Sequence, residues 1–162
     1  IAQRFRSLSE DFAAQGFSFS RTVLSAALGR MPLAVQNILG VSGSTPGLRL
    51  ERVYAAADGP LAYLVNYVRA DRCPGIEAID FSKVSLFDTL HTTYGLPIER
   101  GRRTLSAQAA TGVVATALDI APGTAVLYVE QVSFARGGDP IEYSDVWINS
   151  AKVTITSVLE RG

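Results

Sequence analysis

The stretch GGDPIEYSDVWI at Gly137–Ile148 repeats, in its pattern, the stretch DGPLAYLVNYV at Asp58–Val68. Each opens on a glycine turn and continues as a run of apolar and aromatic residues, which is typical of a hairpin turn and the strand that follows it. An offset of 79 residues, which becomes 80 after one extra residue in the second turn, extends the match. Nine of the 30 positions in Leu39–Val68 are then identical, where average residue frequencies predict roughly two.

This repeat predicts a duplicated unit of helix, loop, strand, turn and strand. The alternative is that two unrelated hairpins share turns and apolar alternation. Duplication predicts an α+β fold in which two hairpins join one antiparallel sheet, related by a pseudo-twofold axis, with helices covering one face. A ligand cleft is then expected between sheet and helices near that axis, since pockets favour junctions between structural units.

The remaining patterns fill in the chain around the two hairpins. Apolar spacing, capping residues and breakers predict helices at Ala2–Ala14, after Pro32, after Ser85 with its Ser-x-x-Asp box, and around Val113–Leu118. Extended segments are predicted at Phe17–Gly29, Leu48–Ala57, Leu61–Arg69, Ile98–Ala109, Val126–Ala135 and Ile141–Asn149.

Composition narrows the class of protein. The 162 residues suit a single domain covering 1–162, and 15 basic residues balance 15 acidic ones, which gives no general attraction to nucleic acid or anionic lipid. No membrane span or signal peptide is visible, and a single cysteine fits a reducing compartment. We therefore expect a cytoplasmic domain. Because the chain begins with Ile, we expect it to be a fragment with sequence missing upstream.

Catalytic and metal-binding patterns are scarce. The only histidine, His91, falls within a predicted helix and has no nearby cysteine or second histidine with which to hold a metal. Cys73 precedes Pro74-Gly75 in a loop and lacks partners for a nucleophilic triad, so we expect an inert thiol. The stretch GVSGSTPG lacks the lysine of a phosphate-binding loop. We predict no cofactor, no metal and no enzymatic activity.

Strand parity suggests a binding site instead. Arg52 and Tyr54 share a strand face with Leu48 and Leu50, and an inward-facing guanidinium needs an anionic or acceptor partner. On the second hairpin, Glu142 shares a face with Ser144, Val146 and Ile148. Arg52 and Glu142 are therefore predicted to face a common cavity. The alternatives are a structural ion pair or a solvated face, and a solvated face is what we expect for Arg100 and Arg102.

Three segments carry a family resemblance: GLRLERVYAAADGPLAYLVNYV, SLFDTLHTTYGLPIERGRRTL and ALDIAPGTAVLYVEQVSFARGGDPIEYSDVWI. In this order and spacing they resemble the UTRA domain, the effector-sensing domain of the HutC subfamily of GntR transcription regulators, over about Leu8 to Glu160. The resemblance implies a chorismate-lyase-like fold with a six-stranded antiparallel sheet, a ligand cleft and a homodimer. It also implies an upstream winged helix-turn-helix that binds DNA and is absent here.

The resemblance further implies a set of effector contacts: Arg52, Tyr54, Leu64, Ser85, Phe87, Glu142 and Ile148. Tyr54, Leu64 and Phe87 depart from phosphosugar-sensing members, which place an arginine, a glutamate and often a tyrosine there. We therefore hypothesise a smaller or more apolar effector with one acidic group, read by Arg52 and Ser85, with Glu142 accepting from a hydroxyl or amine. The alternatives are a chorismate-lyase-like small-molecule enzyme and a dimerisation module with a vestigial pocket.

Overall fold

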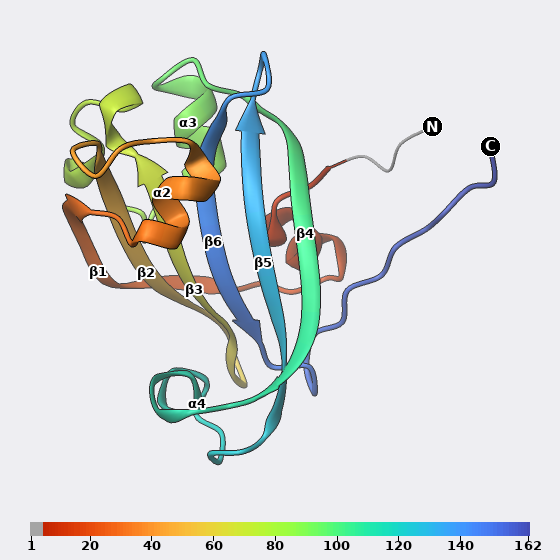
Figure 1. Ribbon diagram of the computed structural model, residues 1–162. Coiled ribbons are helices and arrows are strands. Elements are labelled where there is room, and N and C mark those ends of the chain that lie inside the picture. The colour runs from red at the N-terminus through yellow and green to blue at the C-terminus, as the bar shows by residue number, and fades with distance from the viewer. Residues whose placement is uncertain (1–4) are drawn as a thin grey trace.

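The computed structural model describes residues 5–162 and contains one six-stranded antiparallel sheet in the order β1-β2-β3-β6-β5-β4 (Figure 1). The strands are β1 Ser20–Arg30, β2 Pro46–Ala56, β3 Gly59–Arg69, β4 Ile98–Ala109, β5 Ala125–Ala135 and β6 Pro140–Ile148. The helices are α1 Leu8–Ala14, α2 Leu33–Leu39, α3 Leu86–Thr92 and α4 Gly112–Leu118, with short 3-10 turns η1 Ala70–Arg72 and η2 Ile76–Ala78. The α+β class and the six-stranded sheet are confirmed.

Most predicted elements are also confirmed, and the first helix differs at its start. It begins at Leu8, after the cap residue Ser7, whose Oγ accepts from the backbone N–H of Glu10. The predicted positions 2–4 lie outside the described residues. None of the helices in residues 5–162 is long and apolar enough to cross a membrane.

The internal repeat is confirmed by the strand register. At the centre of the sheet β3 pairs with β6, and Val65 lies opposite Asp145, its own counterpart at an offset of 80. The irregularity after Tyr54 in the first hairpin recurs after Ser133 in the second, which is the equivalent position. The outer strands obey the same relation, since β1 pairs with β2 as β4 pairs with β5. The repeat is thus longer than the sequence indicated, and comprises β1-α2-β2-β3 and β4-α4-β5-β6.

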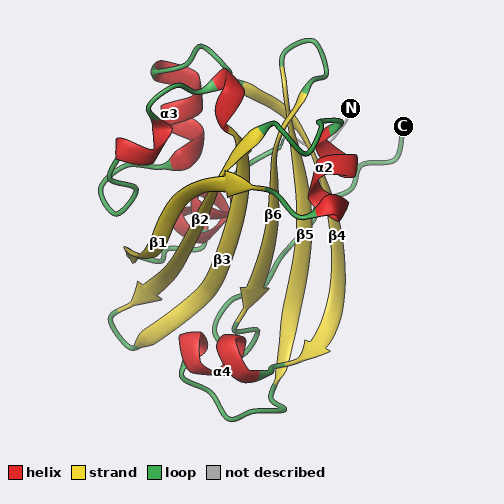
Figure 2. Ribbon diagram, turned by 60° about the vertical axis from the view of Figure 1, so that its left-hand side comes forward, coloured by secondary structure: helices red, strands yellow, loops and turns green. Residues whose placement is uncertain are grey.

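The helices lie on both faces of the sheet, which corrects the expectation that they cover one face (Figure 2). Helices α2 and α4 pack on one face, which we call the α2/α4 face, against side chains such as Tyr143 and Val65. Helices α1 and α3 pack on the opposite face, the α1/α3 face, against Leu64 and Leu50. The physical reason is that the two central strands are apolar on both sides. Strand β3 is buried from Leu61 through Asn66 without alternation.

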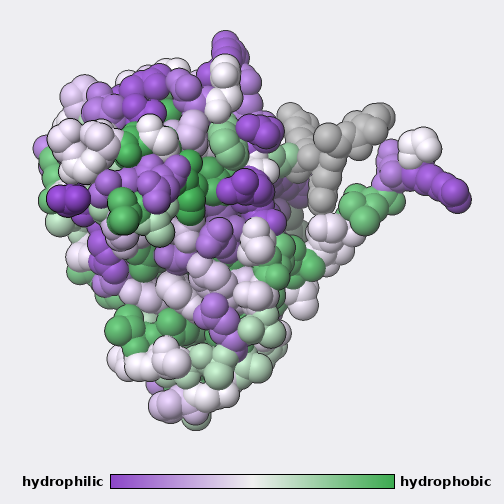
Figure 3. Space-filling model, in the orientation of Figure 1, coloured by the Kyte–Doolittle hydropathy of each residue, from purple (hydrophilic) through white to green (hydrophobic). Residues whose placement is uncertain are grey.

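The two repeats are interlocked on the α2/α4 face. Helix α2 of the first repeat packs mainly on β6 of the second, and α4 of the second packs on β3 of the first. Leu39 of α2 lies in a cluster with Val132, and its repeat counterpart Leu118 of α4 lies in a cluster with Tyr63. The surface in Figure 3 mixes polar and apolar residues, with apolar colour around α4, where Val113 is exposed.

Candidate ligand site

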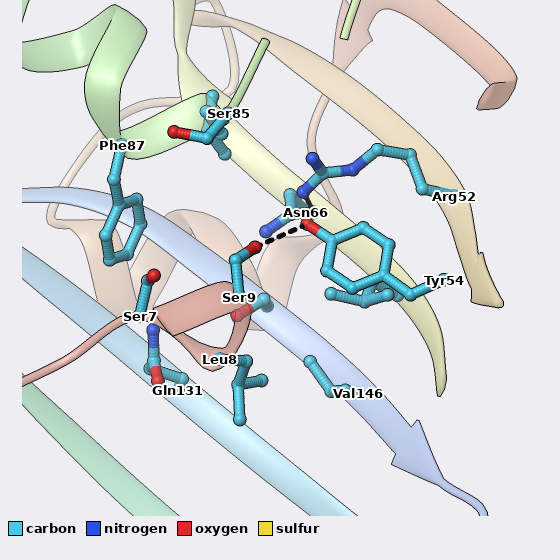
Figure 4. Close-up of a pocket in the computed structure, with 13 residues that line it drawn as sticks. Ser7, Leu8, Ser9, Arg52, Tyr54, Asn66, Ser85, Phe87, Gln131 and Val146 are labelled. Atoms are coloured by element: carbon cyan, nitrogen blue, oxygen red, sulfur yellow. Dashed lines mark hydrogen bonds between the residues drawn. The ribbon is translucent and has the colours of Figure 1, made fainter. Parts of the chain in front are cut away.

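A small pocket lies on the α1/α3 face, between the central strands and the first turns of α1 and α3 (Figure 4). Its volume is about 40 Å³. Because one buried water needs about 10–15 Å³, the pocket has room for about three waters. It is lined by Ser7, Leu8, Ser9, Arg52, Tyr54, Leu64, Asn66, Ser85, Leu86, Phe87, Gln131, Ser144 and Val146.

Arg52 is the charged group of this pocket, and it is only 2 % exposed. Its Nη2 donates to Asn66 Oδ1 at 2.9 Å, while Nε and Nη1 are buried without a hydrogen-bond partner. No described carboxylate lies within salt-bridge distance of it, since the ion pairs found in residues 5–162 involve other cations. Burial lowers the pKa of Arg52. Two desolvated donors therefore lack an acceptor, an arrangement that costs free energy unless a ligand supplies one.

Glu142 lies beneath the pocket rather than in its wall. It is fully buried, and its carboxylate accepts from Asn66 Nδ2 at 2.9 Å and from Ser133 Oγ at 2.6 Å. Burial raises the pKa of Glu142, while these hydrogen bonds and the charge of Arg52 oppose the rise. Arg52 and Glu142 do share one face, as strand parity predicts. They do not face a common cavity or form an ion pair, because Asn66 lies between them.

Four other predicted residues reach the pocket, and one does not. Tyr54, Leu64, Ser85 and Phe87 line it together with Arg52, whereas Ile148 is fully buried in the core. Ser85 caps α3, since its Oγ accepts from the backbone N–H of Asp88 at 3.0 Å. The Ser85 hydroxyl proton is left free for a ligand. Five of the seven predicted residues thus gather in one pocket wall.

Sequence reasoning missed several lining residues, some of which carried a signal. Asn66, Ser144 and Val146 have the same strand parity as Leu64, so strand alternation alone was enough to place them on this face. Gln131 is the repeat counterpart of Arg52 at the offset of 79. Ser7, Leu8, Ser9 and Leu86 come from helix starts, and only tertiary packing brings them to the sheet.

A second arginine lies behind Tyr54. Arg21 on β1 is directly opposite Tyr54 in the register, and its Cζ lies 5.3 Å from the ring centroid of Phe19 and 5.8 Å from that of Tyr54. Its Nε is also buried without a partner. In residues 5–162 the buried side-chain nitrogen and oxygen atoms without partners all belong to Arg21 and Arg52. Two arginines with unpartnered buried donors therefore lie beside Tyr54.

The other residues considered from sequence stand apart from the pocket. His91 is exposed on α3, and Arg100 and Arg102 are exposed, as expected. Cys73 is buried in the core, and burial raises its pKa to about 11, which keeps the thiol uncharged. Within the described part of the chain, no group of three or more His, Cys, Asp or Glu side chains is arranged to hold a metal.

The solved structures with a similar fold include an effector domain and a GntR-family transcriptional regulator. The effector domain of PhnF from Mycobacterium smegmatis superimposes with a TM-score of 0.88 at 22% identity, covering 96% of this chain and 95% of that one. A GntR-family transcriptional regulator from Enterococcus faecalis V583 gives a TM-score of 0.78 at 25% identity, covering 88% of this chain and 100% of that one.

Sequence comparison assigns the family. The model of the UTRA domain matches residues 14–154, so the chain belongs to the UTRA domain family. The HTH-type transcriptional repressor NagR of Bacillus subtilis (strain 168) is 22% identical over 159 residues, which cover 98% of this chain and 65% of that protein. The chain therefore spans about two thirds of that relative's length. Together these matches identify a regulatory domain of the kind found in GntR-family transcription regulators.

Proposed function

We propose that this is the effector-sensing domain of a cytoplasmic bacterial transcription regulator of the HutC subfamily, and that its pocket binds a small molecule carrying an acidic group. The observation that carries the proposal is the buried guanidinium of Arg52 with two donors that have no acceptor. A structural arginine of this burial is normally paired with a carboxylate or carbonyl group. Here an anionic ligand would supply the missing acceptor.

The pocket wall fits such a ligand in three respects. The Nε and Nη1 groups of Arg52 are donors for carboxylate or phosphate oxygens, and Ser85 adds a hydroxyl donor. Leu64, Phe87 and Val146 form an apolar side that suits a hydrocarbon portion. The role given to Glu142 changes, because its carboxylate is fully buried behind Asn66 and does not line the pocket. Its part in binding is to orient Asn66 rather than to contact the effector.

Binding requires the pocket to open. Sites for small molecules usually have about 300–1,000 Å³, several times the volume present here. The sheet is continuous beneath the pocket, so the groups able to move away are the starts of α1 and α3, each helix having seven residues. An effector that selects the open state shifts the population of α1 positions. In the intact protein, we propose, a winged helix-turn-helix precedes α1 and binds DNA as part of a homodimer.

Affinity measurements on matched variants test the site. A panel of anionic metabolites is screened by thermal shift, because a ligand specific to the native state raises its melting temperature. Binding of any hit is then titrated by calorimetry. Arg52→Gln is expected to lose at least about tenfold in affinity, since charge-assisted hydrogen bonds disappear. Arg49→Gln is the control, because Arg49 lies on the same strand but faces the other way and pairs with Glu51. Equal affinity of wild type and Arg52→Gln would remove the proposed site.

The small volume of the pocket also favours a second reading, a dimerisation module with a vestigial pocket. A pocket without a ligand gains nothing from a buried, unpaired guanidinium, and this argues against it. The two readings predict different outcomes of the screen. A vestigial module shows no metabolite-dependent shift and remains a dimer by sedimentation. A lyase-like enzyme, the remaining rival, consumes its ligand, which mass spectrometry of the incubated hit detects.

A further inference from the structure

A chain of hydrogen bonds crosses the α1/α3 face from the pocket to the far edge of the sheet. From Arg52 on β2 it passes through Asn66 on β3 to Glu142 on β6, with both distances 2.9 Å. From Glu142 it continues to Ser133 and Gln131 on β5, at 2.6 and 3.2 Å. We call this set of residues, with Arg103, the polar relay.

The relay ends at Arg103 on β4, which contacts helix α1. The Nε of Arg103 donates to Gln131 Oε1 at 2.5 Å, and its Nη1 forms a salt bridge with Asp11 of α1 at 2.8 Å. Its Nη2 donates to the carbonyl oxygen of Arg6, just before the helix. One guanidinium therefore joins the sheet, the segment that enters α1, and α1 itself.

The donor direction of the relay is fixed by its chemistry. A guanidinium can only donate and an ionised carboxylate can only accept. Asn66 must therefore turn its oxygen to Arg52 and its amide nitrogen to Glu142, and Gln131 must turn its oxygen to Arg103. In both halves of the relay, each residue donates a hydrogen bond to the next one in the direction from the arginine to Glu142. Moving one arginine therefore alters the hydrogen-bond geometry of the next residue in the same half.

The relay begins in the pocket wall, and the start of the helix that Arg103 contacts at the other end lines the same pocket. Arg52, Asn66 and Gln131 line the pocket, and so do Ser7, Leu8 and Ser9 at the start of the helix that Arg103 holds. Ser9 Oγ also donates to the hydroxyl of Tyr54 at 3.2 Å (Figure 4). The state of Arg52 and the position of α1 are thus linked by consecutive hydrogen bonds across five strands.

From this geometry we infer that Arg103 is a positioning residue, which couples the candidate ligand site to helix α1 through the polar relay. An anion bound to Nε and Nη1 of Arg52 draws the guanidinium away from Asn66, and the change passes through Glu142 and Gln131 to Arg103. The salt bridge between Arg103 and Asp11 then changes in strength. The regulatory meaning of this coupling rests on the proposed function, whereas the coupling itself can be measured without any ligand.

The test is hydrogen exchange of α1 in three variants of the domain, followed by mass spectrometry. Arg103→Lys keeps the charge but cannot contact Gln131, Asp11 and Arg6 together. Ser133→Ala breaks the middle of the relay, and Ser133 touches neither Arg103 nor α1 through any hydrogen bond in the described structure. The double variant completes the cycle. Arg102→Lys and Ser106→Ala, exposed positions on β4, are the matched controls.

Coupling predicts a definite pattern of exchange rates. Peptides covering α1 exchange about tenfold faster in Arg103→Lys and several-fold faster in Ser133→Ala, while both controls match wild type. Once Arg103 is replaced, Ser133→Ala adds no further acceleration. If Ser133→Ala leaves α1 at the wild-type rate, or if the two effects multiply independently, Arg103 is only a local anchor and the inference is wrong. Asn66→Ala, judged by the same criteria, replaces Ser133→Ala if that variant fails to fold. Since no ligand enters the assay, its outcome is separate from that of the effector screen.

Discussion

The buried charge of Arg52 lowers the stability of the unliganded domain. Its charge is buried and is not in direct contact with a carboxylate. Asn66 lies between Arg52 and Glu142 and is hydrogen-bonded to both. Leaving a buried charge without its partner costs roughly 3–5 kcal/mol when measured by deleting one member of a pair. An anion that occupies the free donors recovers part of this cost. If the proposed site binds an anion, its affinity at Arg52 is gained at the expense of stability without the ligand, as is usual for functional sites.

The buried carboxylate predicts a pH dependence of folding. Because burial raises the pKa of Glu142 above its ordinary value of 4.5, the native state binds more protons than the unfolded state between the two values. Stability is then full below about pH 4.5 and falls as pH rises through the native pKa. This fall is absent in Glu142→Gln, so the stability of the variant relative to wild type increases as pH rises. A tenfold difference between the proton affinities of the native and unfolded states changes the free energy of unfolding by about 1.4 kcal/mol.

Urea unfolding between pH 4.5 and 8, followed by the fluorescence of Trp147, measures this effect. Glu99→Gln serves as the control, because Glu99 is an exposed glutamate paired with Arg136. Parallel stability curves for Glu142→Gln and wild type would show that Glu142 keeps an ordinary pKa in the folded protein.

Arg21 predicts a preference among anions. Its charge lies on the far side of Tyr54 from the pocket, and it strengthens the field for an anion at Arg52 without touching it. Arg21→Gln is expected to weaken binding about three- to tenfold for a doubly charged anion and less for a singly charged one. Before the effector is known, the stabilisation by inorganic phosphate at pH 8 and at pH 6 provides the comparison. An identical loss at both pH values would contradict the prediction.

At the scale of elements, all four α-helices in residues 5–162 have seven residues and depend on docking for their stability. Apolar spacing and the cap residue Ser85 predicted that such helices exist, whereas the cap at Ser7 was not predicted. The sequence did not predict which face they cover, because that depends on which strands are buried twice. The run Leu61–Val65 is apolar at both parities and carried this signal, but the interpretation based on the repeat assigned the helices to one face. Strand alternation placed Arg52 and Tyr54 on the face that lines the pocket, and the family resemblance supplied Leu64. The contribution of Ser7–Ser9 could not be predicted, since it depends on where α1 packs.

Gly101 allows the segment before α1 to approach the sheet. A Cβ at this position of β4 would lie 2.0 Å from Cε2 of Phe5, so the ring could not stay in place. Gly101→Ala is expected to displace the segment before α1 and to increase its proteolysis about tenfold, while the melting temperature changes little. Gly29→Ala on β1 is the control, because a Cβ there meets nothing within 4 Å. Equal proteolysis of the two variants would mean that the contact of Phe5 with Gly101 does not hold this segment.

At the scale of the whole molecule, a symmetric scaffold carries an asymmetric site. The equivalent positions on β2 and β5 hold Arg52 in one repeat and Gln131 in the other, and both line the pocket. One repeat supplies the charge, and the other supplies the amide that leads to Arg103 and α1. The pseudo-twofold axis thus explains why the pocket lies at the centre of the sheet. The break in symmetry makes the two ends of the pocket different, with the proposed anion site at one end and the connection to α1 at the other.

The interlocked helices predict that the two repeats unfold together. Leu39 and Leu118 are 1 % exposed, and each packs on the hairpin of the opposite repeat. Leu39→Ala and Leu118→Ala are each expected to cost about 2–5 kcal/mol, as for other buried leucines. Because each leucine holds the other repeat, both variants should keep a single transition, with circular dichroism and Trp147 fluorescence coinciding. Leu33→Ala, at an exposed position of α2, is the control and should cost less than about 0.5 kcal/mol. A variant in which the fluorescence transition separates from the circular dichroism transition would show that the repeats are independent units. A relay that crosses from β2 to β4 could then not transmit a change between them.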